Sequence, residues 1–252
     1  MDGVSAVPTD RESELQASLT AVRARLDRAA ADAGRNVGEI QLLPVTKFFP
    51  ASDVLLLHAM GCTEFGESRE QEASGKAAEV GAELSGEPVR WHMVGRIQRN
   101  KVRGIAEWAH AAHSVDDLRV AAALDRAVGR ALDEGRRAEP LQVYLQISLD
   151  GDAGRSGVDV RRADLVDELA AAVDAAAPLR LVGVMGIPPL DADADAAFAM
   201  LAAERDRVQQ RCGQPLGLSA GMSGDLEVAV RHGSTCLRVG TALLGRRPLT
   251  SP

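Results

Sequence analysis

The sequence predicts a single (β/α)8 barrel, a TIM barrel, with one extra helix at its N-terminal end. Apolar runs of strand length alternate with stretches of helical periodicity along the chain, and eight strands can be counted, each followed by a helix or the start of one. This alternation is typical of a parallel sheet, and 252 residues is an ordinary length for a closed α/β barrel. The competing fold, a doubly wound open sheet, should carry a glycine-rich phosphate turn after its first strand. Here that strand ends in Lys47-Phe48-Phe49-Pro50, which favours the barrel.

The extra helix comes first and has signals at both ends. Thr9 and Glu12 fit a capping box, Gly34 stops the helix, and the apolar residues between them fall on one face. The strands that follow are expected at 40–46, 63–65, 90–94, 109–113, 141–147, 179–185, 216–219 and 236–239. The helices between them are expected at about 53–60, 67–82, 98–107, 115–134, 161–176, 195–212 and 225–232.

These elements are expected to form one domain over residues 1–252, because no linker, internal repeat or low-complexity tract divides them. Residues 1–9 are polar and acidic and are expected to be disordered. They contain no apolar segment, so no signal peptide is expected. No uninterrupted apolar run reaches membrane-spanning length.

Charge and cysteine content exclude several classes of function. A formal net charge of −7 leaves no basic excess to neutralise phosphates, so no nucleic-acid partner is expected. Cys62, Cys212 and Cys236 are far apart and form no CxxC pair, which indicates reduced thiols rather than a disulfide framework or a zinc site. We therefore expect a soluble cytoplasmic protein with no membrane association and no metal.

The most informative single residue is Lys47, at the end of the first predicted strand. Functional residues of α/β barrels lie at the C-terminal ends of the strands, which is where Lys47 is expected. A lysine at a strand end is more often simply solvated than chemically active. An amine held among apolar residues at the barrel mouth, however, would have a lowered pKa and could form a Schiff base with an aldehyde.

The last two strands supply a second indication of a site. They run into SAGMSGD at 219–225 and RVGTALLG at 238–245, two turns rich in glycine and hydroxyl groups that lead into short helices. Free backbone N–H groups at such turns bind phosphate, and barrels commonly place a phosphate there. Two such turns opposite a lysine on the first strand indicate a site for a phosphorylated aldehyde. Pyridoxal 5′-phosphate is the obvious candidate.

Long motifs in the chain resemble one known family. They are LLPVTKFFP, FGESREQEASGKA, WHMVGRIQRNKVR, HSVDDLRVAAAL, LQISLDGDAGRSGV, LVGVMGIPP and LSAGMSGDLEVAVRHGSTCLRVGTALLGRR. In this order, and over nearly the whole chain, they closely resemble the pyridoxal phosphate homeostasis protein family. Members of that family are single-domain relatives of the alanine racemase barrel.

The resemblance implies a set of cofactor-binding residues. They are Lys47, Ser68, His92, Ser219, Met222, Ser223, Arg238, Gly240 and Thr241. Lys47 would be the Schiff-base lysine, and Ser223, Gly240 and Thr241 would cradle the phosphate, with Met222 and Ser219 nearby. Arg238 matches the arginine that faces the pyridine nitrogen in racemase-like sites.

Ser68 and His92 are less direct candidates for contact with the cofactor than the other residues of this set. Ser68 stands where the family usually has an asparagine that approaches the cofactor, and serine is shorter and has no amide. A water could bridge Ser68 to the ring oxygen of the cofactor. His92 lies in a predicted strand, where a histidine is more often a hydrogen-bonded structural residue than a catalyst. It is the one candidate for a catalytic role.

The function implied by the resemblance is to hold pyridoxal 5′-phosphate as an aldimine on Lys47, in vitamin B6 and amino-acid homeostasis and without a dedicated catalytic cycle. Arginine has no acceptor and stays charged, so Arg238 cannot hold a proton on the pyridine nitrogen. The ring then remains a poor electron sink, which disfavours carbanion chemistry. The implied partners are amino acids and apo-enzymes that need the cofactor, the latter through transient contacts.

Two alternatives stay open. An amino-acid racemase of alanine racemase type would need a base on the opposite face of the cofactor, either His92 or water. Alanine racemases take that base, a tyrosine, from a C-terminal domain of the partner subunit, whereas this chain ends soon after its last strand and its only tyrosine, Tyr144, lies in mid-strand. The expected lack of that domain favours a monomer. A class I aldolase-like enzyme would use Lys47 on a sugar phosphate, which leaves Arg238 without an explanation.

Overall fold

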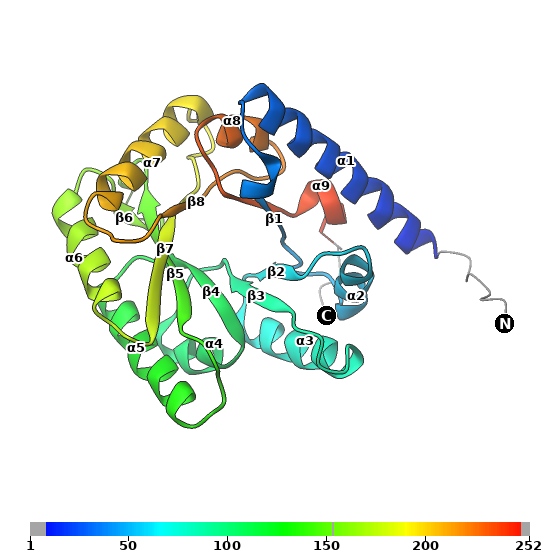
Figure 1. The fold of residues 1–252 in the computed structure, drawn as a ribbon, viewed down its shortest axis with the longest axis horizontal. Helices are drawn as coiled ribbons and strands as arrows, with labels where there is room; N and C mark the ends of the chain where they lie inside the picture. Colours follow the sequence, from blue (N-terminus) through cyan, green and yellow to red (C-terminus); the bar gives the residue numbers. More distant parts are fainter. Residues whose placement is uncertain (1–8, 153, 248–252) are drawn as a thin grey trace.

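A computed structural model describes residues 9–152 and 154–247, and at its centre parallel strands curve into a barrel (Figure 1). The strands are β1 (Gln41–Pro44), β2 (Glu64–Glu67), β3 (Arg90–Met93), β4 (Ala109–Val115), β5 (Leu141–Ser148), β6 (Val158–Asp159), β7 (Leu179–Gly186), β8 (Gly217–Ser219) and β9 (Cys236–Val239). The eight predicted strands are confirmed, with slightly shifted ends. The short β6, which pairs with the end of β5, was not predicted.

The barrel is nearly closed. Its strands follow one another in the order β1-β9-β8-β7-β5-β4-β3-β2, and every pairing is parallel. β1 and β2 meet just beyond the end of β1, where Val45 pairs with Gly66 and the Thr46 N–H donates to the Gly66 carbonyl at 2.9 Å. A Cβ at Gly66 would lie 3.2 Å from the Val45 side chain, so glycine permits this close approach. The predicted (β/α)8 fold is confirmed.

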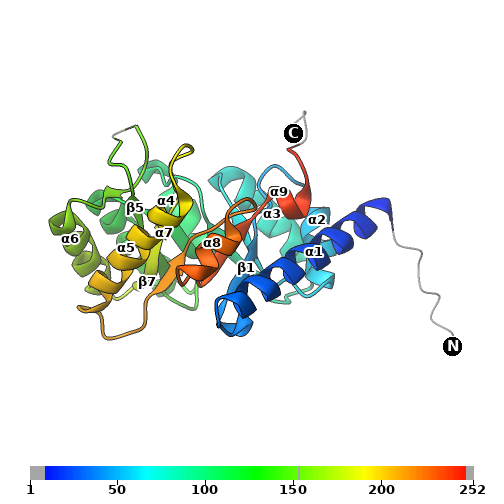
Figure 2. The same cartoon turned by 90° about the horizontal axis from the view of Figure 1, so that it is seen from above.

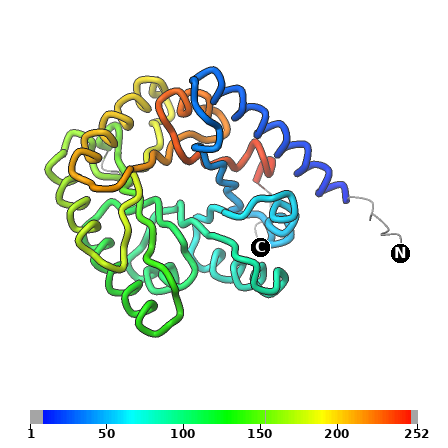
Figure 3. The backbone as a smooth tube through the Cα atoms, in the orientation of Figure 1, coloured from blue at the N-terminus to red at the C-terminus, as the bar shows by residue number. Residues whose placement is uncertain are grey.

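Helices surround the barrel as an outer layer (Figures 1 and 3). They are α1 (Asp10–Asp32), α2 (Ala51–Ala59), α3 (Glu70–Glu83), α4 (Val102–Trp108), α5 (Leu118–Asp133), α6 (Ala163–Asp174), α7 (Ala194–Gln209), α8 (Leu226–Arg231) and α9 (Thr241–Leu244), with 3-10 turns η1 (Val37–Glu39) and η2 (Arg99–Lys101). In α5, Val120, Leu124 and Val128 recur at helical spacing and form the buried face. No helix among the described residues is long and apolar enough to cross a membrane.

The extra helix α1 begins where the capping box predicts, because the Thr9 hydroxyl accepts a hydrogen bond from the Glu12 N–H at 3.1 Å. The predicted disorder of residues 1–9 concerns a segment that, apart from Thr9, lies outside the described residues. α1 runs along the barrel beside α8 and α9 (Figures 1 and 2). Arg25 of α1 pairs with Glu227 of α8 at 2.8 Å, so α1 is joined to the helix that follows β8.

Strand alternation separates an apolar layer from a polar interior. On β2 and β3, Phe65 and Trp91 are buried and their ring centroids lie 5.8 Å apart. Between Trp91 and Met93, the side chain of His92 takes the opposite side of the strand, as the period of two requires. That side is the barrel interior, because His92 bonds there to His113 of β4. The interior therefore carries polar groups that reach toward the candidate site.

Candidate functional site

The C-terminal edge of the barrel brings together most of the residues predicted to bind the cofactor. Lys47 follows β1, Ser68 follows β2, Ser223 lies in the loop after β8, and Gly240 and Thr241 follow β9. In the barrel, β8, β9, β1 and β2 are consecutive neighbours. These five residues therefore occupy one arc of the C-terminal edge.

Lys47 itself is exposed, so the prediction that apolar residues enclose its amine is wrong. Burial ends at Thr46, and the chain then turns at Phe48, whose φ of 70° lies in the left-handed region that non-glycine residues rarely adopt. The Phe48 N–H donates to Glu72 Oε1 at 2.8 Å and holds this turn. Lys47 Nζ lies 5.8 Å from the centroid of the Phe48 ring, and no carboxylate of the described residues is within ion-pair range of it. Its amine is therefore open to an aldehyde from solvent.

The buried lysine is Lys76 of α3, which was not predicted to take part in the site. Its side chain is 6% exposed, and Nζ donates to the Thr46 carbonyl at 2.9 Å and to Glu67 Oε1 at 2.6 Å. The Thr46 hydroxyl donates to the same Glu67 oxygen at 2.7 Å. Burial raises the pKa of the Glu67 carboxyl, although Lys76 opposes this shift. Because Thr46 precedes Lys47, this buried pair fixes the backbone from which Lys47 projects.

Ser223, Gly240 and Thr241 form a polar cradle at the ends of β8 and β9. The Ser223 hydroxyl accepts a hydrogen bond from the Ala242 N–H at 3.0 Å, which joins the two turns. The backbone N–H groups of Gly240 and Thr241 donate to no acceptor among the described residues. Unpaired N–H groups beside a hydroxyl suit the oxygens of a phosphate. Met222, also predicted at this site, is exposed on the same loop.

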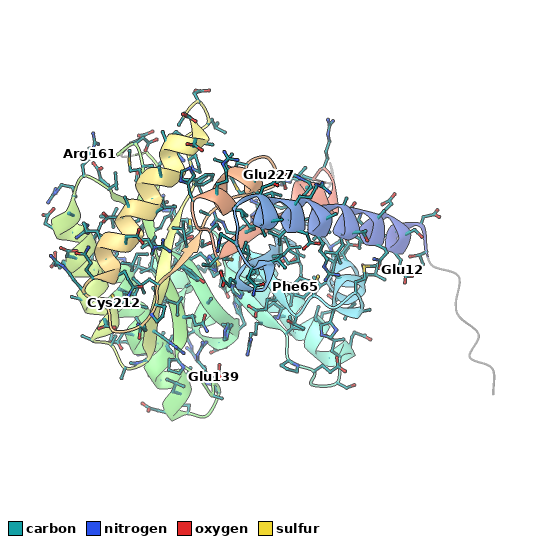
Figure 4. The ribbon with its side chains drawn as sticks, turned by 45° about the horizontal axis from the view of Figure 1, so that its top comes forward. Glu12, Phe65, Glu139, Arg161, Cys212 and Glu227 are labelled. Carbon is teal, nitrogen blue, oxygen red and sulfur yellow. The ribbon has the colours of Figure 1, made fainter. Side chains whose placement is uncertain are left out.

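Helix α1 supports this cradle through Arg25. Its Nη1 donates to the Ser223 carbonyl at 3.1 Å, while Nε and Nη2 bind the carboxylate of Glu227 at 2.8 and 2.9 Å. The mutual hydrogen bonds raise the pKa of Arg25 and lower the pKa of Glu227. Figure 4 shows Glu227 beside α1. The extra helix therefore positions the loop that carries Ser223.

Arg238 of β9 lies in the barrel interior and is 5% exposed. Its Nη1 donates to Ser219 Oγ at 2.7 Å and its Nη2 to the Gly186 carbonyl at 3.1 Å. Burial lowers the pKa of Arg238, but a guanidinium stays charged at physiological pH. The structure places Ser219, which is fully buried, as a partner of Arg238. The remaining N–H groups of the guanidinium are left for a ligand.

His92 is buried, and both of its ring nitrogens are engaged. Nε2 bonds to Glu64 Oε2 at 2.8 Å, and Nδ1 bonds to His113 Nε2 at 2.9 Å. Tyr144 stacks on His113 with ring centroids 4.3 Å apart, and burial raises the pKa of its hydroxyl. Neither His92 nor Tyr144 is free to act as an opposite-face base. Glu64 and His113 were not predicted as part of the interior.

A cavity of about 540 Å³ opens at the C-terminal ends of β2 and β3. Its lining includes Phe48, Ser68, Arg69, Met93, Arg96 and Lys101. The Ser68 hydroxyl forms no hydrogen bond with the described residues, so it can reach a ligand or a water there. Lys47 does not line the cavity, but its neighbour Phe48 does. The cavity and the exposed amine therefore adjoin each other.

Fold and site together define a class of protein, the barrels of the type found in the N-terminal domain of alanine racemase. The model of that family, described as alanine racemase, N-terminal domain, matches residues 17–248. The alanine racemase of Corynebacterium glutamicum superposes with a TM-score of 0.63 over 91% of this chain and 60% of that chain, at 17% identity. At that identity the likeness shows the fold alone.

More similar relatives narrow the class. The pyridoxal phosphate homeostasis protein of Mycobacterium tuberculosis is 59% identical over 255 residues, which cover 99% of this chain and 98% of that protein. The protein of the same name from Escherichia coli is 35% identical and covers 93% and 97%. PipY of Synechococcus elongatus, solved with PLP bound, has a TM-score of 0.72 at 32% identity and covers 87% and 99%. The chain belongs to the pyridoxal phosphate homeostasis protein family.

Proposed function

We propose that this protein holds pyridoxal 5′-phosphate covalently through Lys47 and serves vitamin B6 and amino-acid homeostasis without a dedicated catalytic cycle. The observation that carries the proposal is the exposed amine of Lys47 on the same arc of the barrel as the N–H groups of Gly240 and Thr241, none of which has a hydrogen-bond or ion-pair partner within residues 9–152 and 154–247. The names of the relatives and the PLP bound to PipY support it.

The lysine content of the chain supports Lys47 as the point of attachment. The sequence contains three lysines, Lys47, Lys76 and Lys101. Lys76 is buried and paired with Glu67 at 2.6 Å, so its amine cannot react without breaking that pair. The amine of Lys101 lies 3.7 Å from Glu70, and both residues line the cavity. Lys47 is the lysine whose amine is both open and next to the phosphate cradle.

The residues of the site divide the work of binding among them. When bound, the cofactor supplies an aldehyde carbon that can exchange one amine for another. Lys47 would provide the amine that holds the cofactor, and Ser223, Gly240 and Thr241 would bind its phosphate. Arg238 can donate to the pyridine nitrogen but cannot protonate it, which favours retention of the cofactor over carbanion chemistry.

We place this function in the cytoplasm and in a single chain, with amino acids and apo-enzymes as transient partners. Cys62, Cys212 and Cys236 are free thiols, as in proteins of a reducing compartment. Both ring nitrogens of His92 are held in hydrogen bonds, so His92 is not available as the opposite-face base that the racemase alternative requires.

Transfer of the cofactor to an apo-enzyme tests the proposal. The loaded native protein should restore activity to an apo-enzyme that depends on pyridoxal phosphate, and a Lys101→Ala variant should do the same. A Lys47→Ala variant exposed to the same cofactor and then desalted should retain little of it and restore little activity. Equal transfer by Lys47→Ala and the native chain would contradict the role of Lys47.

Substitution of Ser223 tests the phosphate cradle. We expect Ser223→Ala to weaken binding of pyridoxal 5′-phosphate roughly tenfold or more, since a hydrogen bond to a charged group contributes about 1.5–3 kcal/mol. Fluorescence titration measures the affinity. Pyridoxal, which lacks the phosphate, is the matched ligand and should bind the native chain and the variant alike. An equal loss for both ligands would mean that the substitution disturbs the loop rather than a phosphate contact.

A further inference from the structure

An unbroken chain of hydrogen bonds crosses the barrel interior. Arg238 Nη1 donates to Ser219 Oγ at 2.7 Å, and Ser219 Oγ lies 2.8 Å from His113 Nδ1. His113 Nε2 lies 2.9 Å from His92 Nδ1, and His92 Nε2 lies 2.8 Å from Glu64 Oε2. Glu64 opens β2 at the N-terminal end of the barrel, whereas Ser219 closes β8 at the other end. The chain therefore connects the candidate site to the opposite end of the molecule.

The two ends of this chain set its direction. Arg238 can only donate, and an ionised carboxylate can only accept. Burial raises the pKa of Glu64, but the hydrogen bonds from His92 and Arg90 outweigh it and lower that pKa to about 2, so Glu64 is ionised at neutral pH. His92 then donates from Nε2 and accepts at Nδ1. His113 in turn donates from Nε2 and accepts at Nδ1 the proton of the Ser219 hydroxyl, and every group in the chain is satisfied.

Arg238 needs such a chain because it is buried without a carboxylate in contact. No carboxylate of the described residues lies within ion-pair range of its guanidinium, and the influence of Asp225 acts from farther away. A buried charge without a partner is strongly destabilising. The chain ends on a carboxylate, and aligned hydrogen bonds polarise one another along it. The negative charge of Glu64 can therefore act on Arg238 through the neutral groups His92, His113 and Ser219.

We propose that Glu64, His92, His113 and Ser219 form a relay that positions Arg238 and supplies its remote counter-charge. This inference rests on the proposed function, in which Arg238 faces the pyridine nitrogen of the cofactor. Ser219 and the Gly186 carbonyl fix two nitrogens of the guanidinium, so the relay sets which N–H groups remain for the ring. Glu64, His92 and His113 are positioning residues that act through Arg238.

The groups packed around the relay fit this arrangement. At its far end, Gln41 Nε2 donates to Glu64 Oε2 at 2.5 Å and Arg90 lies 3.3 Å from Glu64 Oε1, so both hold the carboxylate in its ionised form. In the middle, Tyr144 stacks on His113 and is neutral because burial raises its pKa. Burial lowers the pKa of His113 well below its usual value, which keeps His113 neutral.

A competing arrangement differs by one proton and can be told apart. A protonated His92 would donate from both nitrogens, so His113 would have to accept at Nε2 and carry its proton on Nδ1. His113 and Arg238 would then both donate to Ser219, and the direction of the relay would be reversed. The position of the proton on each imidazole therefore decides between the two.

The first test is nitrogen-15 NMR of the histidine side chains in the native protein without cofactor. The chain has five histidines, and single substitutions assign them. We expect His92 and His113 at neutral pH to be neutral and to carry their proton on Nε2. A proton on Nδ1 of either ring would overturn the proposed direction. This result does not depend on cofactor binding, so it stands even if the native chain fails to bind pyridoxal phosphate and the proposed function is wrong.

The second test breaks the relay at its centre. His113→Phe keeps a ring against Tyr144 but removes both hydrogen bonds, and we expect about a tenfold weaker affinity for pyridoxal phosphate and a shifted absorption maximum of the bound cofactor. Glu64→Gln keeps an acceptor without the charge and should shift the absorption maximum in the same direction by less. His110→Phe, on the same strand but outside the relay, is the matched control. Native affinity and native absorption in folded His113→Phe would overturn the proposal.

Discussion

Replacement of Lys47 by alanine is expected to abolish the pyridoxyl adduct that borohydride traps in the native protein. The native chain incubated with pyridoxal phosphate should show a yellow absorption band, which borohydride removes. Mass spectrometry of a digest should then locate one pyridoxyl group on Lys47. Alanine offers no amine, and Lys76 is held by Glu67 and the Thr46 carbonyl, so no other lysine next to the cradle can replace it.

Two variants act as controls for this experiment. Lys47→Arg retains the positive charge but has no primary amine, so it should also fail to form the adduct while it still binds the phosphate weakly. Lys101→Ala removes an amine from the rim of the cavity and should leave the adduct on Lys47 unchanged. An adduct that persists in Lys47→Ala and maps to Lys76 or Lys101 would contradict the assignment. A native chain that stays colourless with excess cofactor would contradict cofactor binding altogether.

The alternation of strands and helices, with the composition of two turns, was sufficient to predict the barrel and the position of its site. The strand that Lys47 follows is the first of eight alternating units, and this alternation fixes where the C-terminal edge lies. The turns after β8 and β9 are rich in glycine and hydroxyl groups, so Ser223 and Gly240 could be placed on that edge from the sequence. In a parallel barrel, residues at successive strand ends meet without any further information.

What could not be predicted depends on which groups meet across the fold. The exposure of Lys47 follows from the turn at Phe48, whose positive φ no residue preference indicates. Lys76 lies among small and acidic residues of a helix, and its burial follows from the approach of α3 to Glu67. His92 and His113 lie twenty-one residues apart, and their contact depends on the register of β3 with β4.

The buried pair beneath Lys47 gives the largest expected effect on stability. We expect Lys76→Met to lower the free energy of unfolding at pH 7 by about 3–5 kcal/mol, because it leaves a buried carboxylate without its cation. Glu67 is fully buried, and its second oxygen, Oε2, already lacks a hydrogen-bond partner among the described residues. Methionine keeps the unbranched shape of lysine, so loss of packing contributes little. Urea unfolding followed by tryptophan fluorescence measures the change.

The pH dependence separates this cause from a general loss of packing. Burial raises the pKa of Glu67 in the native fold, and removal of Lys76 removes the charge that opposes that rise. A carboxyl whose folded pKa is raised stabilises the fold at low pH and loses that contribution as pH rises toward the folded pKa. The deficit of Lys76→Met relative to the native chain should therefore grow by up to about 1.4 kcal/mol per pH unit between the folded pKa of Glu67 in the native chain and its higher folded pKa in the variant.

A neutral pair is the matched control for this dependence. In the double variant Lys76→Met with Glu67→Gln, neither position of the pair carries a titratable group, so the part of the deficit that varies with pH should be small. Arg162→Met removes one side of an exposed pair with Asp164 and should leave stability nearly unchanged. If Lys76→Met costs no more than Arg162→Met, or costs the same at every pH, the buried pair does not hold the strand end that presents Lys47. The backbone before Lys47 would then owe its position to the strand pairing of Val45 with Gly66 and Val239.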